Sequence, residues 1–337
     1  MTRTVVIFVI AGIVLIAMFL LNVFCGAVDI PMGSAINILM GKDVGDEGVS
    51  FIVLYSRLPQ ALTAMLTGGA LAVCGLMMQT IFRNPLADPS ILGLSSGAGL
   101  GVALVTLLLG GSFSLGAITL TGFWAVLIAA FFGAMIVASI MFFLSTILRS
   151  GIMLLIVGVM IGYLTSSAIM LLNYFATTDG VRAFTMWGMG NFSSVSLERL
   201  PLFAFIVVVC IAASMLLVKP LNILVLGQQY ASNLGVNVRV LRNEVLVITG
   251  LLTALTTAYC GPIAFVGLTV PHITRIFLNT DDFKLLLPVS VLVGAILTLA
   301  CNVVSTLPVC GGVIPINAVT PIIGAPIVIY IMTKRNF

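Results

Sequence analysis

Residues 83–99 read RNPLADPSILGLSSGAG, a polar and kinked stretch in a chain that is otherwise 61% hydrophobic. The pairs Asn84-Pro85 and Asp88-Pro89 favour turns, because the residue before a proline is pushed out of helical geometry. We expect Asp88 to cap the helix that follows and Pro89 to begin it. The stretch therefore predicts a turn that leads into a helix.

Glycines recur at four-residue spacing after this turn. Gly93, Gly97 and Gly101 fall on one face of the expected helix, and Gly158 and Gly162 repeat the pattern further along. Small residues at this spacing let two membrane helices approach closely. We therefore expect close helix–helix packing on this face.

The composition of the chain indicates a membrane protein. Only 7% of its 337 residues are charged, against about 25% in soluble domains. The apolar residues form blocks of about 20, the length that crosses a bilayer as a helix, and they lack the alternation typical of barrel strands. We predict one all-α polytopic domain over residues 1–337, with ten spans at about 5–24, 58–82, 90–109, 118–148, 152–175, 200–218, 245–260, 262–278, 285–306 and 315–333. The eighth block is short and bounded by prolines, so nine spans is the alternative.

The distribution of basic residues predicts the orientation. Ten spans place both termini on one side of the membrane, and basic residues favour the cytoplasmic side. With cytoplasmic termini, four basic residues lie outside: Lys42, Arg57, Arg182 and Arg199. The other ten lie inside: Arg3, Arg83, Arg149, Lys219, Arg239, Arg242, Arg275, Lys284, Lys334 and Arg335.

Three loops are long. Residues 29–57 and 176–199 lie outside, and the latter is expected to dip into the membrane interface. Residues 219–244 lie inside and mix apolar and polar residues at helical spacing. Gly227 and Gly235 suit helix ends, so this loop predicts two short helices that pack against something.

Five stretches carry a resemblance that covers nearly the whole chain. They are RLPQALTAMLTGGALAVCGLMMQTIFRNPLADPSILGLSSGAGLG (57–101), MWGMGNFSSVS (186–196), LNILVLGQQYASNLGVNVRVLR (221–242), GPIAFVGLTVPHITRIF (261–277) and INAVTPIIGAPIVIYIM (316–332). In this order they resemble the FecCD-type permeases, the membrane subunits of type II ABC importers for iron chelates, haem and cobalamin. The resemblance implies the ten-helix fold of these permeases.

The resemblance also implies partners. Permeases of this family form a dimer, here a homodimer, in a bacterial inner membrane, with two ABC ATPase subunits inside and a substrate-binding protein outside. The chain has no G-x-x-x-x-G-K-[ST] loop. We therefore expect it to be no enzyme and to bind no cofactor, with ATP and Mg²⁺ held by the ATPase, and we expect no nucleic-acid partner.

Site residues follow from the matched motifs. The loop at 221–242 is similar to the helices that couple such permeases to the ATPase, and the residues expected to do so are Leu226, Gly227, Gln228, Ala231, Leu234, Gly235 and Val236. Arg57 matches an outer arginine that pairs with the binding protein in this family; the alternative is a side chain that snorkels to the interface. Departures from the family pattern are Gln60, where a second arginine is frequent, and the stretch CNVVSTLPVC (301–310).

His272 is the only histidine and follows Pro271 in the eighth block. One histidine cannot supply the ligand set of a zinc site, and the cysteines show no C-x-x-C pair, so no metal site is expected. We interpret His272 as structural rather than as a transport residue.

Prolines and a glycine are expected to break the last span: Pro315, Pro321, Gly324 and Pro326. Irregular backbone at membrane depth is tolerated where it lines a cavity or is covered by protein. The fifth, eighth and tenth spans are therefore candidates to line a pathway.

Two other function classes stay open. An ion-coupled secondary transporter also uses broken helices, but no charged residue falls clearly mid-membrane. An importer for an oxyanion such as molybdate would look similar in sequence. A membrane-embedded enzyme lacks a catalytic cluster.

Overall fold

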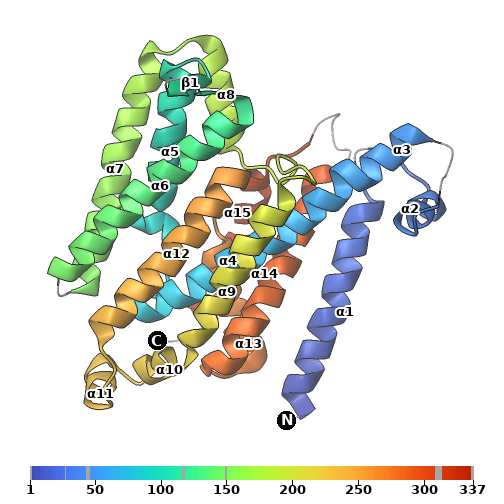
Figure 1. Ribbon diagram of the computed structural model, residues 1–337. Helices are drawn as coiled ribbons and strands as arrows, with labels where there is room; N and C mark the ends of the chain where they lie inside the picture. Colours follow the sequence, from blue (N-terminus) through green and yellow to red (C-terminus); the bar gives the residue numbers. More distant parts are fainter. Residues whose placement is uncertain are drawn as a thin grey trace.

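The computed structural model describes residues 2–26, 28–42, 46–115, 118–148, 150–307 and 313–334. These residues form a bundle of long helices with shorter elements at its two ends (Figure 1). The helices that correspond to the predicted spans are α1 (Thr2–Phe24), α4 (Leu58–Ile81), α5 (Leu94–Ala103), α6 (Gly122–Ile147), α7 (Gly151–Phe175), α9 (Leu200–Leu216), α12 (Val238–Cys260), α13 (Val266–Leu278), α14 (Phe283–Thr306) and α15 (Ile316–Lys334).

The shorter elements lie between these helices. They are α2 (Met32–Leu39), α3 (Glu47–Phe51), α8 (Thr178–Gly188), α10 (Val218–Val225), α11 (Gln228–Asn233), the π-helices η1 (Ile52–Arg57) and η3 (Leu104–Leu108), the 3₁₀-helix η2 (Pro89–Leu92) and the hairpin strands β1 (Ser112–Leu115) and β2 (Ile118–Thr121). Figure 1 shows α3, α8 and the hairpin at one end of the bundle, called here the α3 end. It shows α10, α11 and both termini at the other, the α11 end.

The spans predicted from the sequence are present as helices. By length and composition, five helices in the described part of the chain can cross a membrane alone: Thr4–Phe24, Glu47–Ile81, Gly122–Ile147, Gly151–Phe175 and Phe283–Thr306. The pair α9 and α10, bent by 53°, passes the same test together, and Leu94–Leu108, Val266–Leu278 and Ile316–Ile331 are shorter apolar helices. With α12, whose first turns are polar, these segments match the ten predicted spans.

Five predicted span starts differ from the structure by four residues or more: the second, third, fourth, seventh and eighth spans begin at Glu47, Leu94, Gly122, Val238 and Val266. Local contacts explain two of these differences. The span expected from residue 118 begins at Gly122, because residues 118–121 pair with β1 as a strand. The span expected from residue 245 begins at Val238. The side chain of Asn237 accepts hydrogen bonds from the backbone N–H groups of Arg239 and Val240, both at 3.2 Å, and so caps α12 earlier.

Helix α4 is the centre of the bundle. Its residues 67–81 are all buried, and it packs against α9, α12, α13 and α14. A Cβ added at Gly68 would overlap the carbonyl group of Gly294, and one at Gly75 would overlap the carbonyl group of Gly267. These crossings with α14 and α13 therefore require glycine.

A second group of helices contains α5 between α6 and α7 (Figure 1). A Cβ at Gly97 would overlap the side chain of Val137, and one at Gly101 would overlap the carbonyl group of Ala129. Close packing through the predicted glycine face is thus confirmed for these two glycines, with α6 as the neighbour.

Gly93 and Pro89 differ from the expectation. Pro89 begins the 3₁₀-helix η2 rather than α5. Gly93 ends η2 with a φ of 78° and precedes α5, so it lies outside the helix in a left-handed conformation that glycine adopts at little cost. Its neighbour is Gly158 of α7, with the Gly158 carbonyl oxygen 3.1 Å from an added Cβ.

The last span is not broken as expected. Pro321 and Pro326 lie inside α15, which continues as one helix, and Pro315 precedes it. Membrane helices tolerate proline when neighbouring groups satisfy the freed carbonyls. Gly324 marks the contact with α13, where an added Cβ would lie 2.8 Å from the Oγ1 atom of Thr269.

Candidate functional site

The predicted pair of short helices forms at the α11 end. Helix α9 ends at Leu216, and the chain bends into α10, where Leu221 and Leu224 are buried in the core. Gly227, with a φ of 124°, separates α10 from α11. Gly235, with a φ of 83°, follows α11 and allows the turn into α12. Both glycines therefore stand where the sequence predicts helix ends.

Apolar side chains on this segment point away from the protein. Leu226 is 66% exposed, Tyr230 is 54% exposed and Leu234 is 55% exposed. Ala231, in contrast, is buried. Among the residues expected to act in coupling, Leu226 and Leu234 are thus exposed on either side of α11, and Ala231 within it is buried.

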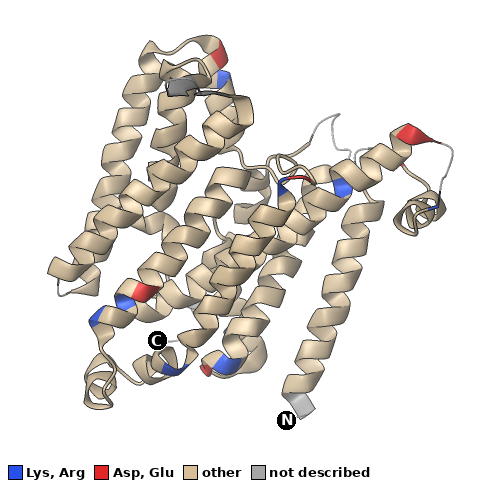
Figure 2. Cartoon of the chain, viewed as in Figure 1, with Lys and Arg blue, Asp and Glu red and all other residues tan. Residues whose placement is uncertain are grey.

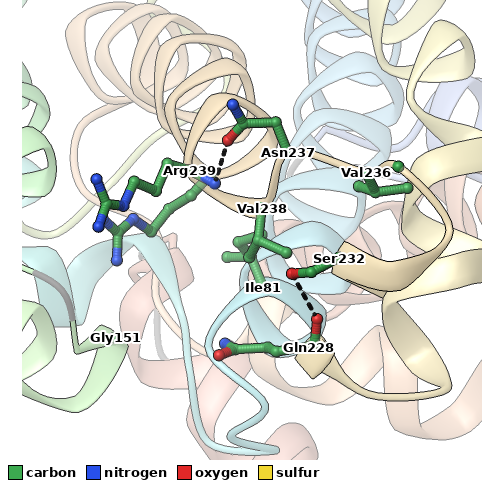
Figure 3. A pocket seen from close by; sticks show the side chains of 10 residues that line it. Ile81, Gly151, Gln228, Ser232, Val236, Asn237, Val238 and Arg239 are labelled. Carbon is green, nitrogen blue, oxygen red and sulfur yellow. Dashed lines mark hydrogen bonds between the residues drawn. The ribbon is translucent and has the colours of Figure 1, made fainter. Parts of the chain in front are cut away.

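A cavity of about 560 Å³ lies beside α11. Figure 3 shows Gln228 and Ser232 on one side of it and Asn237 and Arg239, from the start of α12, on the other. The other lining residues are Ile81, Gly151, Gly235, Val236, Val238 and Arg242. Among the described residues, the lining holds two arginines and no carboxylate beside three apolar side chains, so its charge is positive.

One end of the segment is bonded to α14 through Asn222 of α10. The Nδ2 atom of Asn222 donates to Asp282 Oδ1 at 2.6 Å, and its Oδ1 atom accepts the backbone N–H of Phe283 at 2.7 Å. Asp282 also accepts the backbone N–H of Lys284 at 2.9 Å, and this bond is the main reason that the pKa of Asp282 is lowered. The N-terminus of α14 is therefore satisfied partly by its own cap and partly by α10.

The other end of the segment leads into α12, which is bonded to α6 through Arg242. The guanidinium group donates to Ser145 Oγ at 2.9 Å, to the Ser145 carbonyl oxygen and to the Leu148 carbonyl oxygen at 2.9 Å. Ser145 Oγ in turn donates to Asn243 Oδ1 at 2.7 Å. Because these carbonyls end α6 without partners inside the helix, Arg242 completes its last turn.

The turn after α4 is folded as its sequence predicts. Asp88 Oδ1 accepts the backbone N–H of Ser90 at 2.9 Å and its hydroxyl at 2.7 Å. Asn84 Oδ1 accepts the N–H of Leu86 at 2.9 Å. Arg83 is exposed, with a φ of 48°. The predicted cap at Asp88 is confirmed, although it serves η2. Burial raises the pKa of the Asp88 carboxyl group despite these two bonds.

Helix α13 holds this turn. His272 is 4% exposed, and its Nε2 atom lies 2.9 Å from the carbonyl oxygen of Pro85. One turn later, Arg275 donates to Gln79 Oε1 at 2.8 Å and faces Asp281 Oδ1 at 3.5 Å. Pro271 lies inside α13, one residue before His272. A hydrogen bond near a helix irregularity is the structural contact that we expect of His272.

At the α3 end, Arg57 is buried rather than exposed, and its contact with a binding protein stays a prediction. Its side chain is 6% exposed, and the guanidinium group donates to the carbonyl oxygens of Val23, Phe24 and Val28. The side chain also borders a second cavity, of about 530 Å³, at the α3 end, so it is covered in this structure and is not presented on the surface. Arg57 instead fixes the chain after α1 against η1.

The two departures from the family pattern meet in space. Gln60 Nε2 donates to Asn302 Oδ1 at 3.0 Å, and Asn302 Nδ2 donates to Asn22 Oδ1 at 2.7 Å. These three amides border the same cavity of about 530 Å³ at the α3 end. An uncharged chain of amides thus links α1, α4 and α14.

Sequence reasoning missed Asn222, Arg242 and Asn302, because their partners are distant in the chain. Arg149 and Arg335, which enter the predicted charge asymmetry, lie outside the described residues. Within the described ranges, no group of three or more His, Cys, Asp or Glu residues is placed to hold a metal ion.

Comparison with known proteins gives consistent results. The family model described as FecCD transport family matches residues 14–334. The chain is 35% identical over 281 residues to the vitamin B12 import system permease protein BtuC of Klebsiella pneumoniae, covering 83% of this chain and 82% of the relative. It is 36% identical over 282 residues to BtuC of Salmonella typhimurium, covering 82% of each. A solved structure described as an inward-facing conformation of a putative metal-chelate type ABC transporter superposes with a TM-score of 0.83 at 28% identity, covering 98% of this chain and 99% of that one.

Proposed function

The chain belongs to the FecCD transport family, and we propose that it carries a metal chelate, haem or cobalamin into a bacterial cytoplasm. In this proposal it is the permease subunit of a binding-protein-dependent ABC importer. ATP is hydrolysed by a separate ATPase, which also holds Mg²⁺.

Three exposed apolar side chains in and beside α11 carry the proposal. Leu226, Tyr230 and Leu234 lie in water in the isolated chain, at the end of the bundle that bears the polar loops. Exposed apolar side chains that lie close together in the sequence favour a protein partner. The ATPase would cover them and place a side chain in the adjoining cavity, whose lining includes no carboxylate.

The distribution of charge supports a cytoplasmic α11 end. Figure 2 shows several Lys and Arg residues at that end. They include Lys219, Arg239, Arg275 and Lys284, and the positive-inside rule favours the cytoplasm for them. Both termini lie at this end (Figure 1) and would share its side in the inner membrane.

The assembly would contain two copies of the permease and two ATPase subunits. Helices α7, α13 and α15 remain the candidates to line a pathway at the two-fold axis. A substrate-binding protein would deliver the chelate at the α3 end. Since Arg57 is buried there, its contacts are expected to involve other residues as well.

The proposed substrate class is inferred from the proteins to which the chain is similar. The BtuC proteins named above import vitamin B12, and the superposed transporter is described as a metal-chelate type. A bulky chelate needs a wide, mildly polar path without strongly attracting charges, since fixed charges at membrane depth are costly and hold ions. The oxyanion alternative predicts uptake of molybdate instead.

Reconstitution tests the proposal. Proteoliposomes with the chain, its ATPase and its binding protein are supplied with cyanocobalamin, haemin, a ferric siderophore or molybdate. The proposal predicts uptake of one of the three chelates that requires ATP and the ATPase. Uptake driven by an ion gradient without ATP would contradict it.

A further inference from the structure

The segment that carries α10 and α11 is fastened to two different helices. Asn222 joins it to the first turn of α14, and Arg242 joins the start of α12 to the last turn of α6. Helix α14 packs along α4, the centre of the bundle, whereas α6 packs along α5. A displacement of α11 therefore has two separate routes into the membrane helices.

The side chain of Asn222 makes two hydrogen bonds to the N-terminus of α14. Its amide oxygen takes the N–H of Phe283, one of the helix N-terminal groups that have no partner inside their own helix. Its amide nitrogen donates to Asp282, the cap of the same helix. The donor and the acceptor of one side chain on α10 thus both bond to the N-terminus of α14.

The other contacts of α10 with the core are apolar. Leu221 and Leu224 are buried in the apolar core, and apolar contact is non-directional. Hydrogen bonds weaken steeply when their angle changes. Of these contacts, the pair made by Asn222 is the one that resists sliding of α10 over α14.

Resting on the docking role proposed above, we infer that Asn222 is a positioning residue for coupling. It passes the displacement that nucleotide produces in α11 to the first turn of α14. The Arg242 contact carries the displacement to α6 independently.

Hydrogen exchange of the whole complex tests this inference. The chain with its ATPase is compared with and without Mg-ATP and vanadate, and exchange is followed in peptides from α11, the start of α14 and the end of α6. Amide exchange reports local opening of each element. In the natural chain we expect nucleotide to change exchange in all three.

The variant Asn222→Leu removes both hydrogen bonds at similar volume. We expect it to lose the nucleotide response at α14 and to keep the responses at α11 and α6. The matched control is Asn243→Leu, an asparagine at the same end that accepts one hydrogen bond from Ser145 of α6. The control is expected to keep the α14 response.

A reciprocal exchange separates positioning from folding. Asn222→Asp alone places two carboxylates together and is expected to lose the α14 response. Adding Asp282→Asn supplies a donor to the new carboxylate and keeps a good helix cap, so the response is expected to return. A full α14 response in Asn222→Leu, or no recovery in the double variant, would overturn the inference. No ATPase association by the natural chain would instead refute the docking role itself.

Discussion

The Nε2 atom of His272 lies 2.9 Å from the backbone carbonyl oxygen of Pro85, and this bond holds the turn after α4 on α13. A carbonyl oxygen only accepts hydrogen bonds, so the proton of the ring must be on Nε2. The turn also carries Asp88, which caps η2 and so positions the start of α5. His272 thus connects the two groups of helices at the α11 end.

Loss of this bond is expected to loosen the turn. His272→Leu should lower the free energy of unfolding by about 0.5–1.5 kcal/mol, the net worth of a typical hydrogen bond, and should raise hydrogen exchange at residues 84–90. His272→Gln, which keeps a donor, should do so less. Equal exchange of the turn in His272→Leu and the natural chain would show that the bond is not needed.

The crossing of α4 and α13 allows a test of packing. Gly75→Ala places a Cβ on the carbonyl group of Gly267, and the helices must separate. We expect destabilisation of about 1–3 kcal/mol, as for overpacked cores, measured as a lower melting temperature in detergent.

Gly12→Ala is the matched control for this substitution. No atom lies within 4 Å of a Cβ at Gly12, and alanine is favoured over glycine in a helix by about 1 kcal/mol. The control should be neutral or stabilising. A melting temperature for Gly75→Ala that equals the control would contradict the crossing.

The sequence predicts that Arg57 is an exposed docking residue, whereas the structure buries it. The two roles predict different effects of its replacement. Arg57→Met leaves the carbonyl oxygens of Val23, Phe24 and Val28 without this donor, so the isolated chain should unfold at lower temperature. Arg182→Met, at an exposed site on α8, should leave the unfolding temperature unchanged. If Arg57→Met kept its stability and only weakened association with the binding protein, the buried position would be wrong.

The spans were predictable because each needs only its own composition and length. The cap at Asp88 was also predictable, since its partner Ser90 is two residues away. Gly93 was placed wrongly because four-residue spacing does not distinguish a helical glycine from one in a left-handed turn. The prolines of α15 predict breaks because the sequence does not show which neighbours satisfy the freed carbonyls.

Contacts between distant residues explain the remaining differences. Asn222 and Asp282 are 60 residues apart, and Arg242 and Ser145 are 97 apart. Arg57 resembles an exposed outer arginine in sequence, because nothing local indicates that the chain after α1 returns to cover it. Gln60 and the stretch 301–310, which contains Asn302, each depart from the family pattern, but only the fold pairs Gln60 with Asn302.

The turn at Gly235 gives a further prediction. A bulky residue at a φ of 83° is strained, so Gly235→Leu should distort the end of α11. The chain should still insert, with loss of nucleotide-dependent coupling to the ATPase. The control is Gly41→Leu. Gly41 has a similar φ of 74° but lies at the α3 end, so its replacement should leave coupling intact. Unchanged ATP-dependent uptake in Gly235→Leu would argue against docking through this turn.

Association of the chain with its ATPase, when an exposed leucine beside α11 is changed, tests the docking role directly. The natural chain, Leu226→Asp and the control Leu197→Asp, which is exposed on another loop, are each purified in mild detergent with the ATPase co-expressed. The account predicts a one-to-one complex for the natural chain and the control, and loss of the ATPase from Leu226→Asp. A natural chain that purifies without the ATPase, and still transports in liposomes without ATP, would contradict the account.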